Sequence, residues 1–117
     1  MDDNAVIRDF VKYVGRKLHM EELPRVKISR DARFSLDHKT FGIYLPDQRM
    51  FTVEVHGRNI IDVLRTVAHE MTHHKQNEDA STKSHTDLEI EATAAAGMLI
   101  KLYANDRPEL YAQKPLR

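Results

Sequence analysis

The spacing of apolar residues predicts one helix and three short strands in the first half of the chain. Apolar side chains recur every three to four positions between residues 3 and 20, directly after Asp2, which is a typical helix-starting residue. Shorter runs that are apolar, or that alternate between polar and apolar side chains, predict strands at residues 25–29, 41–45 and 50–56. Because only the turn-forming residues 46–49 separate the last two runs, we expect these strands to form a hairpin.

Two further helices account for most of the second half. Asn59 is a good helix N-cap, and the apolar residues after it keep helical spacing from residue 60 to about residue 77. The alanine-rich segment 86–104 strongly favours a helix. We expect irregular structure in the remaining segments, of which the last is predicted to be a loosely structured tail: 31–40, 78–85 and 105–117.

The order of these elements predicts a single α+β domain that spans residues 1–117. A helix comes first, followed by a small, three-stranded and mainly antiparallel sheet, and then by two helices. A chain of 117 residues is long enough for one modest hydrophobic core and too short for two.

Composition narrows the chemistry that such a domain can carry. Eighteen basic residues balance eighteen acidic ones, so we expect neither nucleic acid nor a membrane as a partner, and no particular oligomeric state is predicted. The chain has no cysteine, and any metal must therefore be held by His, Asp or Glu. The N-terminal segment lacks the features of a signal peptide and no apolar run reaches membrane-spanning length, which makes a cytoplasmic location the default expectation.

The chemically distinctive motif is His69-Glu70-Met71-Thr72-His73, which has the form H-E-x-x-H. Residues four apart lie on the same face of a helix, so His69 and His73 can bind one Zn²⁺, and Glu70 can act as general base on a water that the metal activates. At about 100° per residue, both histidines fall in one polar stripe. The opposite side of the helix is apolar and is expected to be buried: Ile60, Ile61, Val63, Leu64, Val67, Ala68 and Met71. The alternative interpretation of the polar stripe is an ordinary solvent-facing helix surface.

The following helix contains the sequence Glu89-Ile90-Glu91-Ala92-Thr93. Together with the motif, it resembles the gluzincin metallopeptidases, in which a glutamate from a later helix is the third zinc ligand. The small single-domain minigluzincins are also similar in length and in the order of their elements, and the resemblance covers about residues 50 to 104. In many gluzincins, Asp or Asn follows the ligand glutamate four residues later. This implies Glu89 as the third ligand, with Thr93 in the place of that Asp or Asn.

Other third ligands remain open at this point: Glu91, Asp79 and His85. Asp79 lies six residues after His73, where some other zinc proteases place a third ligand, but Gln76 stands where those enzymes have a glycine turn. Glu89 also has an alternative role, because it is spaced to close a capping box with Thr86 at the start of the helix.

The resemblance implies a zinc-dependent peptidase, most simply an endopeptidase, that acts on a peptide or protein substrate. Zn²⁺ would be held by His69, His73 and Glu89, while Glu70 takes a proton from the attacking water and passes it to the leaving amine. The alternative functions are a zinc-binding structural, sensor or interaction module without peptidase activity, and an interaction domain without metal.

Two further features are implied by the resemblance. The first is a sheet edge strand that pairs with an extended substrate, for which the strand Thr52–His56 is the candidate. The second is a His or Tyr that stabilises the oxyanion of the tetrahedral intermediate. The sequence does not distinguish among the candidates for this role: His38, His56, His85, Tyr44, Tyr103 and Tyr111.

Overall fold

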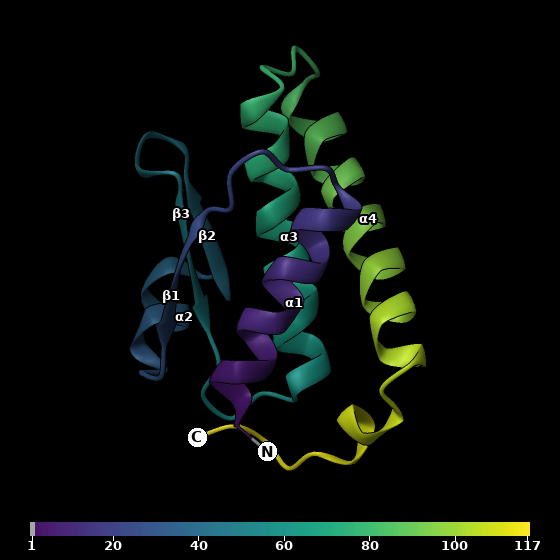
Figure 1. Cartoon of the computed structure of the whole chain (residues 1–117). Coiled ribbons are helices and arrows are strands. Elements are labelled where there is room, and N and C mark those ends of the chain that lie inside the picture. Colours follow the sequence, from purple (N-terminus) through teal and green to yellow (C-terminus); the bar gives the residue numbers. More distant parts are fainter. Residues whose placement is uncertain (1) are drawn as a thin grey trace.

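The computed structural model describes residues 2–117, and the expected α+β fold is confirmed. Figure 1 shows the sheet on one side of helix α3 (Ile60–Glu78) and helix α4 (His85–Asn105) on the other, while α1 (Asp3–Lys17) lies across α3. The remaining elements are β1 (Arg25–Ser29), α2 (Arg33–His38), β2 (Gly42–Leu45), the 3-10 turn η1 (Pro46–Gln48), β3 (Met50–Glu54) and the 3-10 turn η2 (Pro108–Ala112). None of the helices between residues 2 and 117 combines the length and apolar character that a membrane crossing requires.

The predicted helices and strands form within three residues of their expected ends. Asp2 caps α1 as expected, since its side chain accepts hydrogen bonds from the backbone of Asn4 and Ala5. The expected loop at 31–40 is wrong in part, because Arg33–His38 forms α2. This helix buries no residue and has no side-chain N-cap, so neither the apolar spacing nor a capping residue could reveal it.

The sheet has the order β1-β3-β2 and is mixed rather than mainly antiparallel. The expected hairpin forms, with β2 and β3 antiparallel, but β1 and β3 run parallel, with Val26 opposite Phe51. This happens because the chain crosses from β1 to the far edge before the hairpin returns β3 to the centre. The strand leading into α3 is therefore central, and the expectation that Thr52–His56 is an edge strand is wrong. The edge beside α3 is β2.

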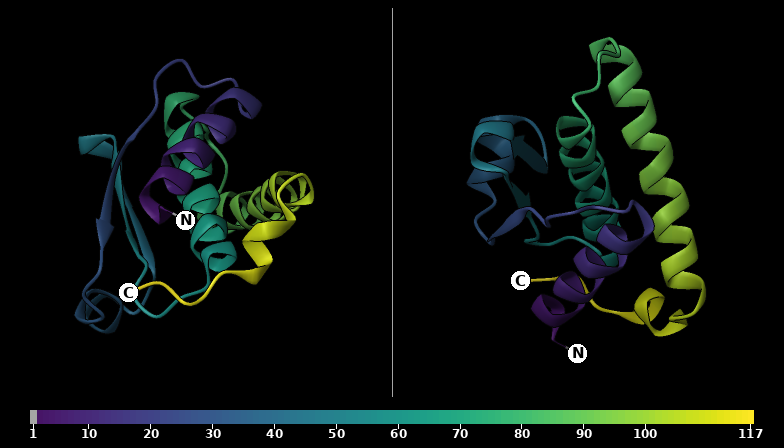
Figure 2. Two further views of the ribbon diagram at one scale, coloured as in Figure 1. Left: turned by 60° about the horizontal axis from the view of Figure 1, so that its bottom comes forward. Right: turned by 45° about the horizontal axis from the view of Figure 1, so that its top comes forward.

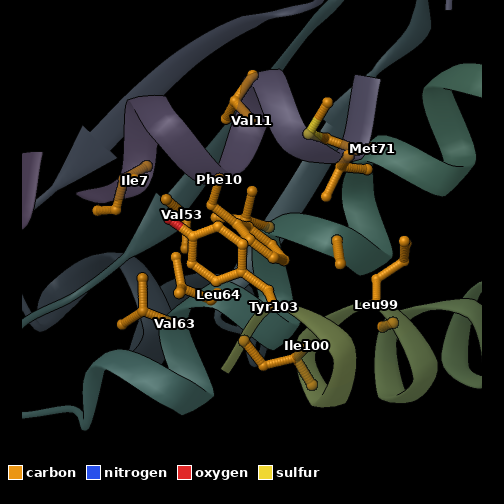
Figure 3. Close-up of a cluster of buried hydrophobic side chains, with 14 of the residues drawn as sticks. Ile7, Phe10, Val11, Val53, Val63, Leu64, Met71, Leu99, Ile100 and Tyr103 are labelled. Atoms are coloured by element: carbon orange, nitrogen blue, oxygen red, sulfur yellow. The ribbon is translucent and has the colours of Figure 1, made fainter. Parts of the chain in front are cut away.

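One hydrophobic core joins the sheet to the three long helices. Figure 3 shows Phe10 of α1 and Tyr103 of α4 meeting over Val53 and Leu64. The rings of Phe10 and Tyr103 pack edge to face with their centroids 4.8 Å apart. Since α3 contributes to this core from its whole inner side, its orientation is fixed, and its other side is fixed with it.

The C-terminal segment is ordered against the body of the protein, which differs from the predicted loose tail. Figure 2 shows the yellow segment running from the end of α4 back across the base of the molecule toward the sheet. Leu110 of η2 is buried in the core. Leu116 forms two backbone hydrogen bonds, accepting from Gly57 at 2.6 Å and donating to Arg58 at 2.9 Å. The segment after Asn105 therefore holds the turn that precedes α3.

Gly42 allows the edge strand β2 to approach α3 closely. A Cβ atom at this position would lie 2.7 Å from Thr66 Cγ2 and 3.1 Å from Glu70 Cγ. Both distances are shorter than an ordinary van der Waals contact, so any larger residue would push β2 away from the helix. Gly42 thereby sets the spacing between the strand and the H-E-x-x-H motif.

We expect Gly42→Ala to lower the free energy of unfolding by about 1–3 kcal/mol, because the added methyl group overpacks the contact between β2 and α3. Gly97→Ala is the matched control. Gly97 lies within α4 with no atom near its hypothetical Cβ, so the same substitution should stabilise the helix by about 0.5–1 kcal/mol. Urea denaturation of both variants measures the difference. Equal effects of the two substitutions would contradict the assigned role of Gly42.

Candidate metal centre

Helix α3 presents His69 and His73 on the side opposite the hydrophobic core. The expected apolar back is fully buried apart from the half-buried Ile61. The two imidazole rings lie one helical turn apart, with their Nε2 atoms 3.1 Å from each other. Both rings are half-buried, so the polar stripe faces a partly enclosed space instead of open solvent.

Glu89 of α4 completes a three-residue cluster with these histidines. Its Oε2 atom lies 3.1 Å from His69 Nε2, and its Oε1 atom lies 3.0 Å from His73 Nε2. The helix is capped by Ser84, whose hydroxyl accepts from the backbone of Asp87, so the alternative capping box with Thr86 does not form. Glu89 falls in the second turn of α4, and its carboxylate faces the two histidines of α3.

The other proposed third ligands lie outside this cluster. Glu91 accepts a hydrogen bond from Gln76 at 2.9 Å and pairs with Lys83. Asp79 is exposed and pairs with Lys75 at 3.3 Å. His85 lines a neighbouring cavity without joining the cluster. Thr93, in the position expected for an Asp or Asn, is exposed on α4.

The spacing of the three donors fits a tetrahedral metal ion. Bonds of about 2.0–2.1 Å in tetrahedral geometry place ligand atoms about 3.3 Å apart. The two Nε2 atoms lie 3.1 Å apart, and each lies 3.0–3.1 Å from a different oxygen of Glu89; with one ligand atom from each residue, the three donors lie within 4.8 Å of one another. Two imidazoles and one carboxylate are also a ligand set of catalytic zinc sites. Burial and the neighbouring His73 ring lower the pKa of His69, although Glu89 opposes the shift, and this favours the neutral imidazole that binds metals.

Gln76 orients His73 and was not identified from the sequence as part of the site. Its side-chain oxygen lies 2.8 Å from His73 Nδ1, and its amide group donates to the backbone oxygen of Leu88 at 3.0 Å and to Glu91. A hydrogen bond from Nδ1–H to this oxygen leaves the Nε2 lone pair of His73 directed at the cluster. The available signal was its position three residues after His73, on the same helix face.

His74 points away from the cluster and is fully buried. Its Nδ1 atom lies 2.8 Å from the hydroxyl of Tyr44, and its Nε2 atom lies 3.0 Å from the backbone oxygen of Glu22. Glu78 Oε1 lies 3.2 Å from the same Nε2 atom but makes no hydrogen bond, because Glu22 takes that donor. His74 therefore ties α3 to β2 and to the loop before β1.

Glu70 is buried beside the cluster, with 7% of its surface exposed. The pKa of Glu70 is raised to about 7, mainly by burial and also by the charge of Glu89. The His73 ring and the backbone of Tyr44 act in the opposite direction. A carboxyl group with this pKa exchanges protons readily near neutral pH, which is what a general base requires. The possibility that Glu70 is an ordinary exposed helix residue is thereby excluded.

Two open cavities meet at Glu70 and Gly42, and these two residues line both cavities. The larger cavity, about 610 Å³, extends along β2 past His73 toward Tyr44 and His85. The smaller one, about 530 Å³, extends past His69 toward Arg58. Together they form a cleft along β2 with the cluster near its middle. We call them the His73 cavity and the His69 cavity.

The positions of the candidate residues reduce the number that could stabilise an oxyanion. Tyr44 and His85 line the His73 cavity, but the hydroxyl of Tyr44 already bonds to His74 and Asn77. Tyr103 lies in the hydrophobic core. The other three candidates line neither cavity: His38, His56 and Tyr111. His85 is therefore the candidate with an uncommitted side chain in the cleft.

No family model matches this chain, and no curated protein or solved structure is significantly similar to it. The site is consequently defined by its own geometry. That geometry consists of three converging donors from two helices, a buried glutamate beside them and a cleft open to solvent.

We expect Glu70→Gln to stabilise the metal-free protein at pH 8 more than at pH 5. In the unfolded chain Glu70 has its ordinary pKa of 4.5, whereas in the folded protein its pKa is about 7. At a pH between these two pKa values, Glu70 is ionised in the unfolded chain but still protonated in the folded protein. The free energy of unfolding of the wild type therefore falls as the pH rises through this window. Glutamine does not titrate, and its advantage should grow across the window to at most about 3 kcal/mol.

Thermal denaturation at the two pH values, with a chelator present, measures this effect. Glu21→Gln is the control, because Glu21 is exposed and its replacement should change stability little at either pH. A gain from Glu70→Gln that is the same at pH 5 and pH 8 would contradict the raised pKa.

Proposed function

We propose that this chain is a small zinc-dependent peptidase of the gluzincin type. The observation that carries the proposal is the convergence of His69, His73 and Glu89 within 4.8 Å beside the buried carboxyl of Glu70. A solvent-facing polar stripe would require neither the inward-facing glutamate from α4 nor the burial of Glu70. Zn²⁺ would be held by His69 Nε2, His73 Nε2 and the carboxylate of Glu89.

In this proposal Zn²⁺ supplies Lewis-acid chemistry, lowering the pKa of a water molecule and polarising the carbonyl group of a peptide. Glu70 would accept a proton from that water molecule while the water oxygen attacks the carbonyl carbon. Glu70 then gives the proton to the peptide nitrogen as the carbon–nitrogen bond breaks. Glu70 is placed for both proton transfers because its carboxyl group is buried beside the cluster and lines both cavities.

An extended peptide would bind along β2. This strand pairs with β3 on one side only, and its other side could pair with a further strand if the peptide replaced the local hydrogen bonds that Gly42 makes with Thr40 and Tyr44 makes with Glu70. Residues of β2 and the segment before it line both cavities, and a peptide paired there would pass over the metal cluster.

The first test is zinc stoichiometry in protein purified without a histidine tag. We expect one Zn²⁺ per chain in the wild type and a loss of affinity of about 100-fold or more in Glu89→Ala, which removes one of three ligands. Glu91→Ala is the matched control, since Glu91 touches only Gln76 and Lys83 and its removal should leave the stoichiometry unchanged. Loss of zinc in Glu91→Ala with retention in Glu89→Ala would reverse the ligand assignment.

The second test is hydrolysis of an unfolded protein such as reduced casein by zinc-loaded protein. Glu70→Gln should keep one Zn²⁺ per chain and lose at least about 100-fold in kcat, because the general base is gone. Full activity in this variant would contradict the role of Glu70 as the general base. Stoichiometric zinc without hydrolysis by the wild type would instead favour the alternative function, a zinc-binding module without peptidase activity.

A further inference from the structure

The two halves of the cleft differ in charge. Two arginines line the cleft, Arg58 and Arg65, and both belong to the His69 cavity, which the acidic Asp62 and Glu70 also line. The His73 cavity has no lysine or arginine in its lining, where the charged groups are the acidic Glu70 and Glu89. One end of the cleft thus offers guanidinium groups to a ligand and the other end does not.

Arg58 is a half-buried cation whose protein partners are all uncharged. Its guanidinium donates to the backbone oxygens of Glu54 at 2.6 Å and Asp62 at 3.0 Å, and to the hydroxyl of Thr66 at 2.8 Å. The ring of Phe41 lies 4.2 Å from its central carbon. Among residues 2–117, no carboxylate oxygen lies within 4.0 Å of it. Three hydrogen bonds occupy three of its five donors, so two donors remain for a ligand.

Burial lowers the pKa of Arg58, although the charges of Asp62 and Glu54 oppose the shift without either carboxylate contacting the guanidinium directly. Its hydrogen bonds hold the planar group in one orientation against the start of α3, so little side-chain entropy remains to be lost on binding. A carboxylate entering the cavity would supply the missing negative charge. It would also form charge-assisted hydrogen bonds, which are about twice as strong as those between neutral groups.

Arg65 adds a second positive charge on the outer wall of the same cavity. Its one acidic partner is Asp62, at 3.4 Å, and both side chains of this pair are more than half exposed. Such pairs are weak and screened by salt, so Arg65 can turn toward a ligand at little cost.

From this asymmetry we propose that the His69 cavity is a carboxylate-binding subsite, formed by Arg58 and Arg65, for the peptide that binds along β2. The inference rests on the peptide binding proposed above and names the chemistry of its substrate. The carboxylate is either the C-terminus of the peptide or the side chain of an Asp or Glu.

The direction of β2 agrees with this assignment. The strand runs from Gly42 beside the His69 cavity to Leu45, and the next residue, Pro46, lines the His73 cavity. A peptide that pairs antiparallel to β2 therefore points its C-terminal end into the His69 cavity. A parallel peptide would place its positively charged N-terminal end beside Arg58 and Arg65, which is electrostatically unfavourable.

The experiment measures binding of short peptides to zinc-loaded Glu70→Gln protein, in which the peptide is expected to stay uncut. Acetyl-tetra-alanine as the free acid and as the amide tests the C-terminal source. Acetylated, amidated hexa-alanine with Glu, Gln or Lys at its fourth position tests the side-chain source. We expect the carboxylate member of at least one series to bind about tenfold or more tightly than its neutral match, and less so at high salt.

Substitution of the arginines then tests the assignment. Arg65→Glu, made in the Glu70→Gln protein, should remove the preference for carboxylate and favour the lysine peptide. Arg58→Gln should reduce the same preference, and its fold is checked by thermal denaturation because Arg58 also holds the start of α3. Lys101→Gln is the control, since Lys101 is exposed on α4 and lines neither cavity.

Equal binding of the carboxylate and neutral peptides, absence of binding by all of them, or a preference unchanged in Arg65→Glu would overturn the subsite. These outcomes are separate from the proposed hydrolysis. Casein cleavage by the wild type without any carboxylate preference would reject the subsite alone. A carboxylate preference without cleavage of any peptide or of casein would reject the peptidase alone.

Discussion

The antiparallel contact between α3 and α4 is the interaction on which the site depends. His69 and His73 lie on one helix and Glu89 on the other, so the three donors converge only in one register. A slip of one helical turn would move Glu89 by about 5.4 Å and disperse them. Gln76 fixes that register, because it accepts from His73 on its own helix and donates to the backbone of Leu88 on α4. The same side chain therefore orients one candidate metal ligand and holds the helix that carries another.

Two buried polar side chains of α3, His74 and Glu70, are compensated unequally by the fold. His74 is fully buried, but both of its ring nitrogens have hydrogen-bond partners, so it contributes to packing without leaving a polar group unsatisfied. Glu70 is nearly as buried, and its raised pKa shows that the charged form is poorly compensated in the metal-free protein. Uncompensated polar groups of this kind concentrate where a protein binds or reacts. The contrast between two neighbouring buried residues separates the structural side of α3 from the side that faces the cleft.

The sequence was sufficient for the elements and for most of the cluster, since both depend on local spacing. The four-residue separation of His69 and His73 and the apolar back of α3 follow directly from helix periodicity. Contacts between elements were harder to predict from the sequence. The parallel pairing of β1 with β3 depends on how the chain crosses the sheet, and α2 buries nothing that a periodic pattern could reveal. The choice of Glu89 over Glu91 depends on which face of α4 packs against α3, and local spacing within α4 does not determine that. The role of Gln76 emerges only when both helices are in place.

The outer edge of β2 suits the proposed pairing with one short peptide better than open-ended strand pairing. A free strand edge is usually a liability, because it can recruit another chain. Here the strand has four residues, and Pro46, which follows it, has no backbone N–H to donate. At the other end Gly42 holds the strand against Thr66 and Glu70. Pairing is thus limited to the stretch between the two cavities, beside Glu70. The short length of β2 would therefore hold the proposed peptide where the donor cluster and the two arginines can contact it.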